Sequence, residues 1–412
     1  MDPGERDAVH TSFALSGFWE VRFGMRTQSD PNEKEASIGE TRLQLQLEQP
    51  IKQAIFKLTS DFLYDPVLSN QYEVRLEEGE GFIDLREASL LLRPIDFIDI
   101  KIGRQILTWG TGDLIFINDL FPKDWNAFFI GRNTEYLKAP SDALKASFFS
   151  ANVNLDIVYT PRFDHDRFID GKRLSFFNTS FGRRTGRDTE VKTERRDAWF
   201  KDNEIALRFY QNLKGLELAL YAYQGYWKSP GGLNSASNLA TFPKLSVYGG
   251  SVRGSLGSGI AHLELGLYDS EDDPKGKNPL IRNSEFRILL GYEQEVIRDL
   301  TATFQYYLEQ ILDYSNFRRN LPNGSVVADK NRHVLTLRLT QLLMNQDLRL
   351  SLFTFYSPSD RDAYLRPKLH YKIDDAWSGE IGGNIFISKE DHTFFGQFEK
   401  NNNVYAGLRM SF

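Results

Sequence analysis

The last ten residues of the chain, Asn403-Val-Tyr-Ala-Gly-Leu-Arg-Met-Ser-Phe412, decide the fold. One parity is apolar and comprises Val404, Ala406, Leu408, Met410 and Phe412, while the other carries Tyr405, Gly407, Arg409 and Ser411. A repeat of two residues is the period of a β-strand, because successive side chains point to opposite faces of the sheet. The segment therefore predicts a strand with one apolar and one polar face that ends the chain on an aromatic residue.

The same alternation recurs along the whole chain. Eighteen segments show it, beginning near residues 11, 37, 53, 81, 97, 143, 153, 203, 215, 242, 258, 283, 299, 332, 346, 361, 376 and 403. The connections after odd-numbered segments are long, with one short exception at 357–360, whereas those after even-numbered segments take only a few residues. Long loops therefore gather at one end of the predicted sheet and tight turns at the other.

This arrangement is typical of outer-membrane barrels, which combine an even number of antiparallel strands with short periplasmic turns and long external loops. A bilayer requires closure, because an open sheet edge leaves backbone amides unpaired. We therefore predict an all-β fold, a transmembrane antiparallel up-and-down β-barrel of about 18 strands. Its expected location is the bacterial outer membrane, in contact with lipid and lipopolysaccharide. The alternative is a soluble all-β protein that ends on Phe412 by chance.

Composition excludes several classes of protein. The 412 residues include no Cys, so thiolate metal sites and cysteine nucleophiles are absent, and the formal net charge of -6 argues against a nucleic-acid binder. No apolar run approaches the roughly 18 residues that a spanning helix needs. None of the six His has a metal-binding spacing such as His-Glu-x-x-His. We expect neither catalysis nor a metal or cofactor site.

The chain is predicted to form one domain. Residues 1–10 are polar and lack the basic and apolar regions of a signal peptide, so we expect a tail on the periplasmic side. Residues 11–412 would form the barrel. Aromatic residues near strand ends are expected to form girdles at the lipid–water boundaries. They are Trp19, Tyr64, Phe82, Trp109, Tyr159, Tyr226, Trp227, Tyr268, Tyr314 and Tyr356.

The parity opposite the apolar one would line the lumen, and its charges are of both signs. Its candidate basic wall residues are Arg42, Arg86, Lys101, Arg338, Arg366, Lys368, Lys372 and Arg409. A basic stripe along a low-dielectric wall can guide anions. The alternative is that these charges pair across strands or anchor inward loops.

The third long connection, residues 110–142, is too apolar for a solvated loop. Burying each large apolar side chain contributes about 1.5–3 kcal/mol, so these residues must pack on something. We predict that the segment folds inward and narrows the pore, with Asp113, Asp119, Lys123, Asp124 and Arg132 as candidate constriction residues. The alternatives are packing over the outer rim or a surface for a partner. The fourth connection, residues 162–202, is highly charged and is expected to be an extracellular flap, partly mobile, that can form a plug.

A local motif resembles a known family. The run Gly103-Arg-Gln-Ile-Leu-Thr-Trp-Gly110, followed by Asn118-Asp119 and Pro122-Lys-Asp124, resembles the Gly-Arg-Gln strand and polar loop of alginate-export-type and related porin-like barrels of Gram-negative outer membranes. The terminal strand resembles that of Gram-negative outer-membrane proteins, which implies that Phe412 is a signal to the barrel-assembly machinery. The family resemblance also implies an eighteen-stranded, loop-gated, basic pore for an acidic polysaccharide. The acidic residues in the predicted wall depart from that pattern.

The sequence thus predicts an outer-membrane channel for passive passage of small or polymeric polar solutes, with anions as one candidate class. Two alternatives stay open. The barrel could be a sheath or docking collar for a partner protein such as a multihaem cytochrome, or a conduit for hydrophobic molecules. The oligomeric state is not predicted.

Overall fold

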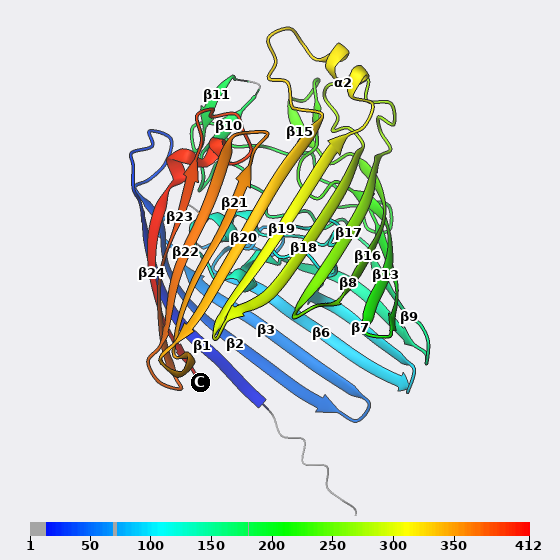
Figure 1. Cartoon of the computed structure of the whole chain (residues 1–412), viewed down its shortest axis with the longest axis vertical. Coiled ribbons are helices and arrows are strands. Elements are labelled where there is room, and N and C mark those ends of the chain that lie inside the picture. Colours follow the sequence, from blue (N-terminus) through cyan, green and yellow to red (C-terminus); the bar gives the residue numbers. More distant parts are fainter. Residues whose placement is uncertain (1–13, 69–71, 180) are drawn as a thin grey trace, which may run out of the picture.

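The computed structural model describes residues 14–68, 72–179 and 181–412. The predicted periplasmic tail, residues 1–10, lies outside the described residues. Within them, eighteen long strands form one closed antiparallel sheet, in which each strand pairs with the next and the last pairs with the first (Figure 1). The strands are β1 (Ala14–Arg26), β2 (Ala36–Ile51), β3 (Ala54–Tyr64), β6 (Ile83–Ile95), β7 (Ile98–Ile106), β8 (Pro140–Phe149), β9 (Asn154–Thr160), β12 (Glu204–Leu213), β13 (Leu216–Tyr226), β16 (Lys244–Leu256), β17 (Gly259–Ser270), β18 (Glu285–Ile297), β19 (Leu300–Ile311), β20 (Asn331–Leu343), β21 (Leu348–Ser357), β22 (Asp362–Lys372), β23 (Trp377–Ile387) and β24 (Asn403–Ser411).

The predicted fold class is confirmed. Each of the eighteen predicted segments begins within three residues of the start of a described strand. The strands could be located from the sequence because the two-residue period is a local property of each segment. Closure follows from the pairing of β24 with β1, where the N–H and C=O groups of Gly17 and Phe412 exchange two hydrogen bonds of 3.0 Å.

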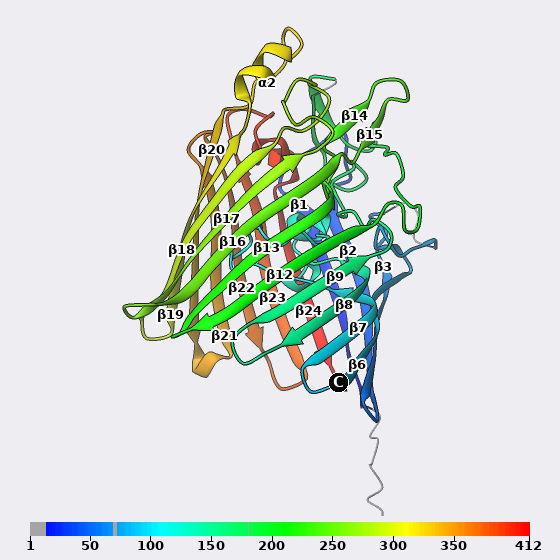
Figure 2. The same ribbon diagram turned by 90° about the vertical axis from the view of Figure 1, so that its right-hand side faces the viewer.

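The two ends of the barrel differ as predicted. Both described chain ends and the tight turns lie at one end, and the long connections lie at the other, together with the short connection between β21 and β22 (Figure 1 and Figure 2). The long connections carry the small hairpins β4 (Val74–Arg75) with β5 (Glu80–Gly81), β10 (Phe176–Asn178) with β11 (Arg183–Thr185), and β14 (Gly232–Asn234) with β15 (Leu239–Thr241). They also carry the helices α1 (Trp125–Ile130) and α2 (Tyr314–Asn320), and a 3-10 turn over Gly396–Asn401. None of the helices among the described residues is long and apolar enough to cross a bilayer.

Side chains alternate between the outer surface and the interior. On β1, Phe23 is 57% exposed whereas its neighbour Arg22 is 3% exposed. The apolar parity therefore faces outward and the polar parity faces inward, as a lipid-embedded barrel requires.

The predicted aromatic girdle is wrong for several residues. Trp19, Tyr64, Phe82 and Tyr356 are exposed on the surface. In contrast, Trp109, Tyr226, Trp227 and Tyr268 are buried, and they pack in the interior. The prediction failed because it used position near a strand end and ignored which face each residue occupies.

Candidate functional site

The connection between β7 and β8, residues 107–139, lies inside the barrel, and we call it the inner loop (Figure 2). Its helix α1 begins where the Asp124 carboxylate accepts a hydrogen bond of 2.7 Å from the N–H of Ala127. The helix ends at Gly131, which has φ 87° and leaves no room for a Cβ atom beside the Tyr405 ring. Asp before the first turn and Gly after the last are favoured helix boundaries, so both ends of α1 are fixed by sequence.

Apolar packing holds the inner loop against the barrel wall. Its buried side chains, Ile117, Phe121, Phe128, Phe129, Ile130 and Leu137, share one cluster with the wall residues Tyr221, Val247, Tyr268, Leu289, Phe353, Phe355, Tyr364 and Phe386. The Phe129 ring centre lies 5.3 Å from that of Tyr364 and 5.4 Å from that of Phe386. Edge-on contacts at these distances are favourable between aromatic rings. The loop is therefore a packed part of the barrel interior.

Polar contacts fasten the first half of the inner loop. The Glu264 carboxylate on β17 accepts hydrogen bonds from the N–H groups of Thr111 and Gly112, the latter at 2.9 Å, and from the side-chain amide of Asn118 at 3.1 Å. Gln305 on β19 accepts from the N–H of Asp113 and donates to its C=O, both at 2.8 Å. These contacts leave little freedom to residues 111–118.

Charged contacts fasten the second half. Arg132 forms an ion pair with Glu40 on β2, at 2.5 Å. The guanidinium groups of Arg42 and Arg86 lie 4.1 and 4.8 Å from the centre of the Tyr136 ring. Cations over an aromatic face are attracted by its electrons. Both halves of the loop are thus anchored to different sides of the wall.

The inner loop separates two cavities. The outer chamber, on the side of the long loops, has a volume of about 520 Å³, and the inner chamber, on the other side, has about 510 Å³. Leu114 lines both chambers. Phe128 lines the outer chamber and Arg366 the inner one, and the Arg366 guanidinium lies 4.2 Å from the Phe128 ring centre. Leu114 and this stacked pair therefore mark the boundary between the chambers.

The inner chamber is basic. Its lining has five Lys and Arg side chains, Arg338, Arg349, Arg366, Lys368 and Arg409, besides His370, and three carboxylates, Glu20, Glu135 and Glu380. Lys368 pairs with Glu380, Arg409 lies 2.9 Å from both Glu20 and Glu135, and Arg338 lies 2.6 Å from Asp113 of the inner loop. Within the described part of the chain, Arg349 and Arg366 form no ion pair. These two guanidinium groups give the chamber an excess of positive charge.

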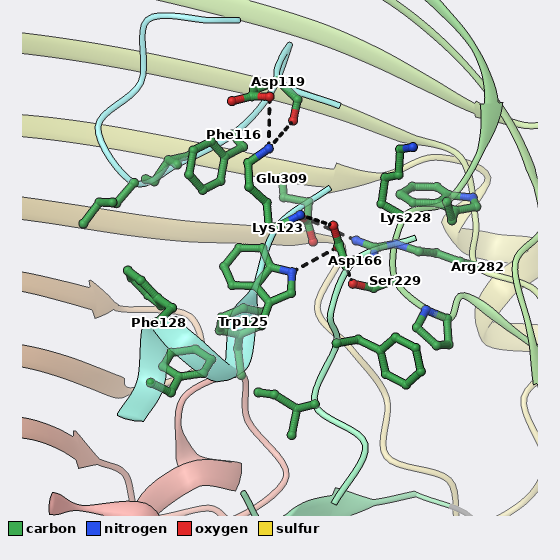
Figure 3. A pocket seen from close by; sticks show the side chains of 18 of the residues that line it. Phe116, Asp119, Lys123, Trp125, Phe128, Asp166, Lys228, Ser229, Arg282 and Glu309 are labelled. Atoms are coloured by element: carbon green, nitrogen blue, oxygen red, sulfur yellow. Dashed lines mark hydrogen bonds and ion pairs between the residues drawn. The ribbon is translucent and has the colours of Figure 1, made fainter. Parts of the chain in front are cut away.

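The outer chamber is lined mainly by aromatic and aliphatic side chains (Figure 3). Part of its wall comes from residues 162–202, which we call the flap. The flap backbone pairs with the inner loop, where the Arg167 C=O accepts from Trp125 N–H at 3.1 Å. The Arg167 guanidinium also contacts Asp84 at 2.7 Å and Asp124 at 3.3 Å. The flap is therefore joined to both the inner loop and the wall.

The predicted constriction residues occupy different places. Asp113 lies beside Leu114 and pairs with Arg338, whereas Asp119 and Lys123 form an ion pair of 3.0 Å in the lining of the outer chamber. Asp124 caps α1, and Arg132 is anchored to Glu40. Of these five, Asp113 is the one next to the boundary between the chambers.

The predicted wall residues also divide. Arg338, Arg366, Lys368 and Arg409 line the inner chamber. Arg42 is buried between Glu40 and Asp61, and Arg86 donates to the C=O groups of Glu135 and Lys138 in the inner loop at 3.2 and 2.9 Å. Lys101 pairs with Glu87, and Lys372 pairs with Asp375 in a tight turn, both at 2.6 Å. Arg42, Arg86, Lys101 and Lys372 therefore stabilise the fold through these contacts and contribute no unpaired charge to the chambers.

Sequence reasoning missed two residues of the site, Arg349 and Gln305. Arg349 shares the inward parity of β21, so alternation could have found it. Gln305 also lies on the inward parity, as does Glu264, which parity assigns to the lumen wall, but the contacts of both depend on the inner-loop backbone that meets them. No group of three or more His, Asp or Glu side chains arranged to hold a metal ion occurs among residues 14–68, 72–179 and 181–412.

Comparisons with known proteins identify the fold. No family model and no curated protein matches the sequence. Solved structures do match the chain. OccD3 (OpdP) of Pseudomonas aeruginosa has a TM-score of 0.56 at 11% identity, and the match covers 97% of this chain and 91% of OccD3. OccK11 (OpdR) of the same organism has a TM-score of 0.57 at 9% identity, with 97% of this chain and 96% of OccK11 covered. OccAB3 of Acinetobacter baumannii has a TM-score of 0.56 at 12% identity, with 97% and 99% coverage. These are outer-membrane porins, and the chain has their fold.

Proposed function

We propose that the protein is a channel of the bacterial outer membrane, through which small polar solutes pass passively, with a preference for anions. The observation that carries this proposal is the pair of chambers on either side of the inner loop, both of which Leu114 lines. A closed barrel with an apolar outer surface and a polar interior suits a protein that surrounds a path across a membrane.

The size of the chambers supports small solutes. Volumes of about 520 and 510 Å³ lie in the range of small-molecule sites, which is about 300–1,000 Å³. The inner loop fills much of the remaining interior with packed side chains. A sheath around a cytochrome would need that space for protein, so the structure favours the channel over the sheath.

The preference for anions rests on Arg349 and Arg366. Other basic groups of the inner chamber have carboxylate partners, so their charges are largely balanced. A net positive field in a narrow cavity with low-dielectric walls concentrates anions. The inner chamber would therefore select by charge.

Planar-bilayer recording of the purified protein tests the channel. We expect stable, ohmic single-channel currents, and a reversal potential in a KCl gradient that has the sign of chloride permeability. A folded barrel that stays silent would overturn the channel. A reversal potential with the sign of potassium permeability would overturn the anion preference.

The proposal also includes the surroundings of the barrel. Outer-membrane lipid and lipopolysaccharide would contact the exposed apolar surface. Phe412, whose backbone pairs with Gly17, would serve as the signal to the barrel-assembly machinery.

A further inference from the structure

The outer chamber leaves large apolar side chains partly uncovered inside the barrel. Phe116 and Trp125 of the inner loop and Phe176 of the flap pack against the buried cluster but keep a half-buried surface toward the chamber. Phe168 of the flap and Phe394 between β23 and β24 line the same space. Three separate chain segments thus turn aromatic surface toward one cavity of about 520 Å³. Apolar surface in a water-filled space favours an apolar occupant.

The chamber has an apolar and a polar side. Figure 3 shows Phe116, Trp125 and Phe128 on one side, where Lys123 and Asp119 pair beside Phe116, and Lys228 and Arg282 on the other. The basic groups on the polar side are already neutralised: Lys228 and Arg282 lie 2.6 Å from Glu204 and Glu285. Net charge therefore does not determine which solute this chamber would bind, in contrast to the inner chamber with its excess of positive charge.

The aromatic groups are arranged edge to face. The rings of Phe116 and Trp125 are 6.2 Å apart at 66°, and those of Trp125 and Phe128 are 6.0 Å apart at 86°. The Asp166 carboxylate accepts a hydrogen bond of 3.0 Å from the indole N–H of Trp125 and another of 2.6 Å from the Ser229 hydroxyl. Because this hydrogen bond already fixes the indole, the Trp125 side chain loses no further conformational entropy when an aromatic ring binds against it. Offset and perpendicular contacts are the preferred geometries between rings.

We propose that the outer chamber is a binding site for the aromatic ring of a transported solute, which packs against Phe116, Trp125 and Phe168. This inference rests on the proposed function and adds the chemical class of solute to it. The ring enters the apolar side, and the polar end of the solute faces the paired groups of Lys228 and Arg282 before it passes Leu114.

Three sulfonates of equal charge test the proposal. Benzenesulfonate carries an aromatic ring, cyclohexanesulfonate an aliphatic one, and methanesulfonate none. Binding of each to the full chain in detergent is measured by titration calorimetry, and chloride currents are recorded separately. We expect saturable binding of benzenesulfonate, binding of cyclohexanesulfonate that is about three- to tenfold weaker, and no binding of methanesulfonate. Equal binding of the two ring compounds, or no binding of benzenesulfonate, would overturn the assignment.

Matched variants place the site. Phe116→Leu and Phe168→Leu keep apolar bulk and remove a ring, so each should weaken benzenesulfonate binding about three- to tenfold. Phe304→Leu makes the same change on the outer surface of β19, where Phe304 is 51% exposed, and should leave binding unchanged. Heat-modifiable gel mobility checks that each barrel is folded. Weaker benzenesulfonate binding in Phe304→Leu would overturn the proposed site. Unchanged binding in the folded Phe116→Leu and Phe168→Leu variants would overturn it as well.

The two proposals fail separately. A barrel that conducts chloride but does not bind benzenesulfonate would overturn the aromatic site and leave the channel standing. A barrel that binds benzenesulfonate but carries no current would overturn the channel and leave a binding site in the outer chamber.

Discussion

The Glu264 carboxylate accepts two hydrogen bonds from Asn118, one from its backbone N–H at 3.3 Å and one from its side-chain amide at 3.1 Å. The same carboxylate also accepts from the N–H groups of Thr111 and Gly112. A single side chain of β17 therefore holds both ends of the segment 111–118 in place. Leu114, at the boundary between the chambers, lies within this segment, so the wall sets the position of the narrowing.

Replacement of Glu264 by Gln should loosen that segment. A Gln side chain keeps one acceptor but presents an N–H₂ group where backbone donors point. Because a buried hydrogen bond to a charged group contributes about 1.5–3 kcal/mol, we expect a loss of about 2–3 kcal/mol in the local stability of the loop. Single-channel recording should then show rapid current fluctuations and a higher mean conductance.

The control is Glu217→Gln on β13, where the carboxylate pairs with Arg208 at 2.6 Å on the neighbouring strand. This change also removes one inward negative charge, but away from residues 111–118. Fluctuations in both variants, or in neither, would contradict the role of Glu264.

Leu114 offers a direct test of the boundary. Its backbone has φ 59°, which is uncommon for a residue with a side chain, and Gln305 holds the preceding residue. Because the chain has no Cys, Leu114→Cys would introduce a single thiol. A bulky methanethiosulfonate reagent should then reduce the single-channel current by most of its value.

Leu220→Cys is the matched control, since Leu220 is 64% exposed on the outer surface of β13. Mass spectrometry confirms that each thiol has reacted. Complete modification of Leu114→Cys with an unchanged current would show that solutes pass elsewhere.

The strands could be predicted from sequence, but the pairing of the lumen charges could not. Alternation places Arg42 and Arg366 on the same inward parity. In the structure, Arg42 is buried between Glu40 and Asp61, whereas Arg366 faces the inner chamber and stacks on Phe128. The difference depends on strand register and on the path of the inner loop, which the period of a single strand does not contain.

The apolar inner loop shows what composition can reveal. Its large side chains required a surface to bury, which made an inward position the expected one. Part of that surface, Tyr364 and Phe386, comes from strands more than 200 residues further along the chain. Such contacts arise only when the barrel closes, so they could not be assigned in advance.

Removal of the unpaired charges should reduce anion preference. We expect Arg349→Gln and Arg366→Gln each to lower the chloride-to-potassium permeability ratio about two- to fivefold, because a unit charge at 4 Å contributes about 1 kcal/mol in water. The reversal potential in a KCl gradient measures this ratio. Lys372→Gln is the control, since Lys372 pairs with Asp375 in an exposed turn. An equal effect of Lys372→Gln would indicate that overall charge, rather than the inner chamber, decides selectivity.

The flap residue Asp164 makes a pH-sensitive contact with the start of β8. The Asp164 carboxylate accepts hydrogen bonds from the Ser141 hydroxyl at 2.7 Å and from the N–H of Asp142 at 2.9 Å. Burial, together with the nearby charges of Asp142 and Glu204, raises the pKa of Asp164 to about 6, although the two hydrogen bonds lower it. Burial likewise raises the pKa of Glu33 to about 7, although Arg187 of the flap lies 3.2 Å away.

A raised carboxyl pKa means that the docked flap favours the protonated form. Protonation of these two carboxyl groups therefore stabilises the docked flap fully below their ordinary pKa of about 4. This stabilisation is lost as pH rises through about 6 for Asp164 and about 7 for Glu33. Two pKa units for Asp164 correspond to about 3 kcal/mol. Hydrogen–deuterium exchange, corrected for the intrinsic rate, should show greater protection of the flap, residues 162–202, at pH 5 than at pH 8. Asp164→Asn, which stays neutral, should remove the part of this change near pH 6, and equal protection at both pH values in the unmodified chain would contradict the prediction.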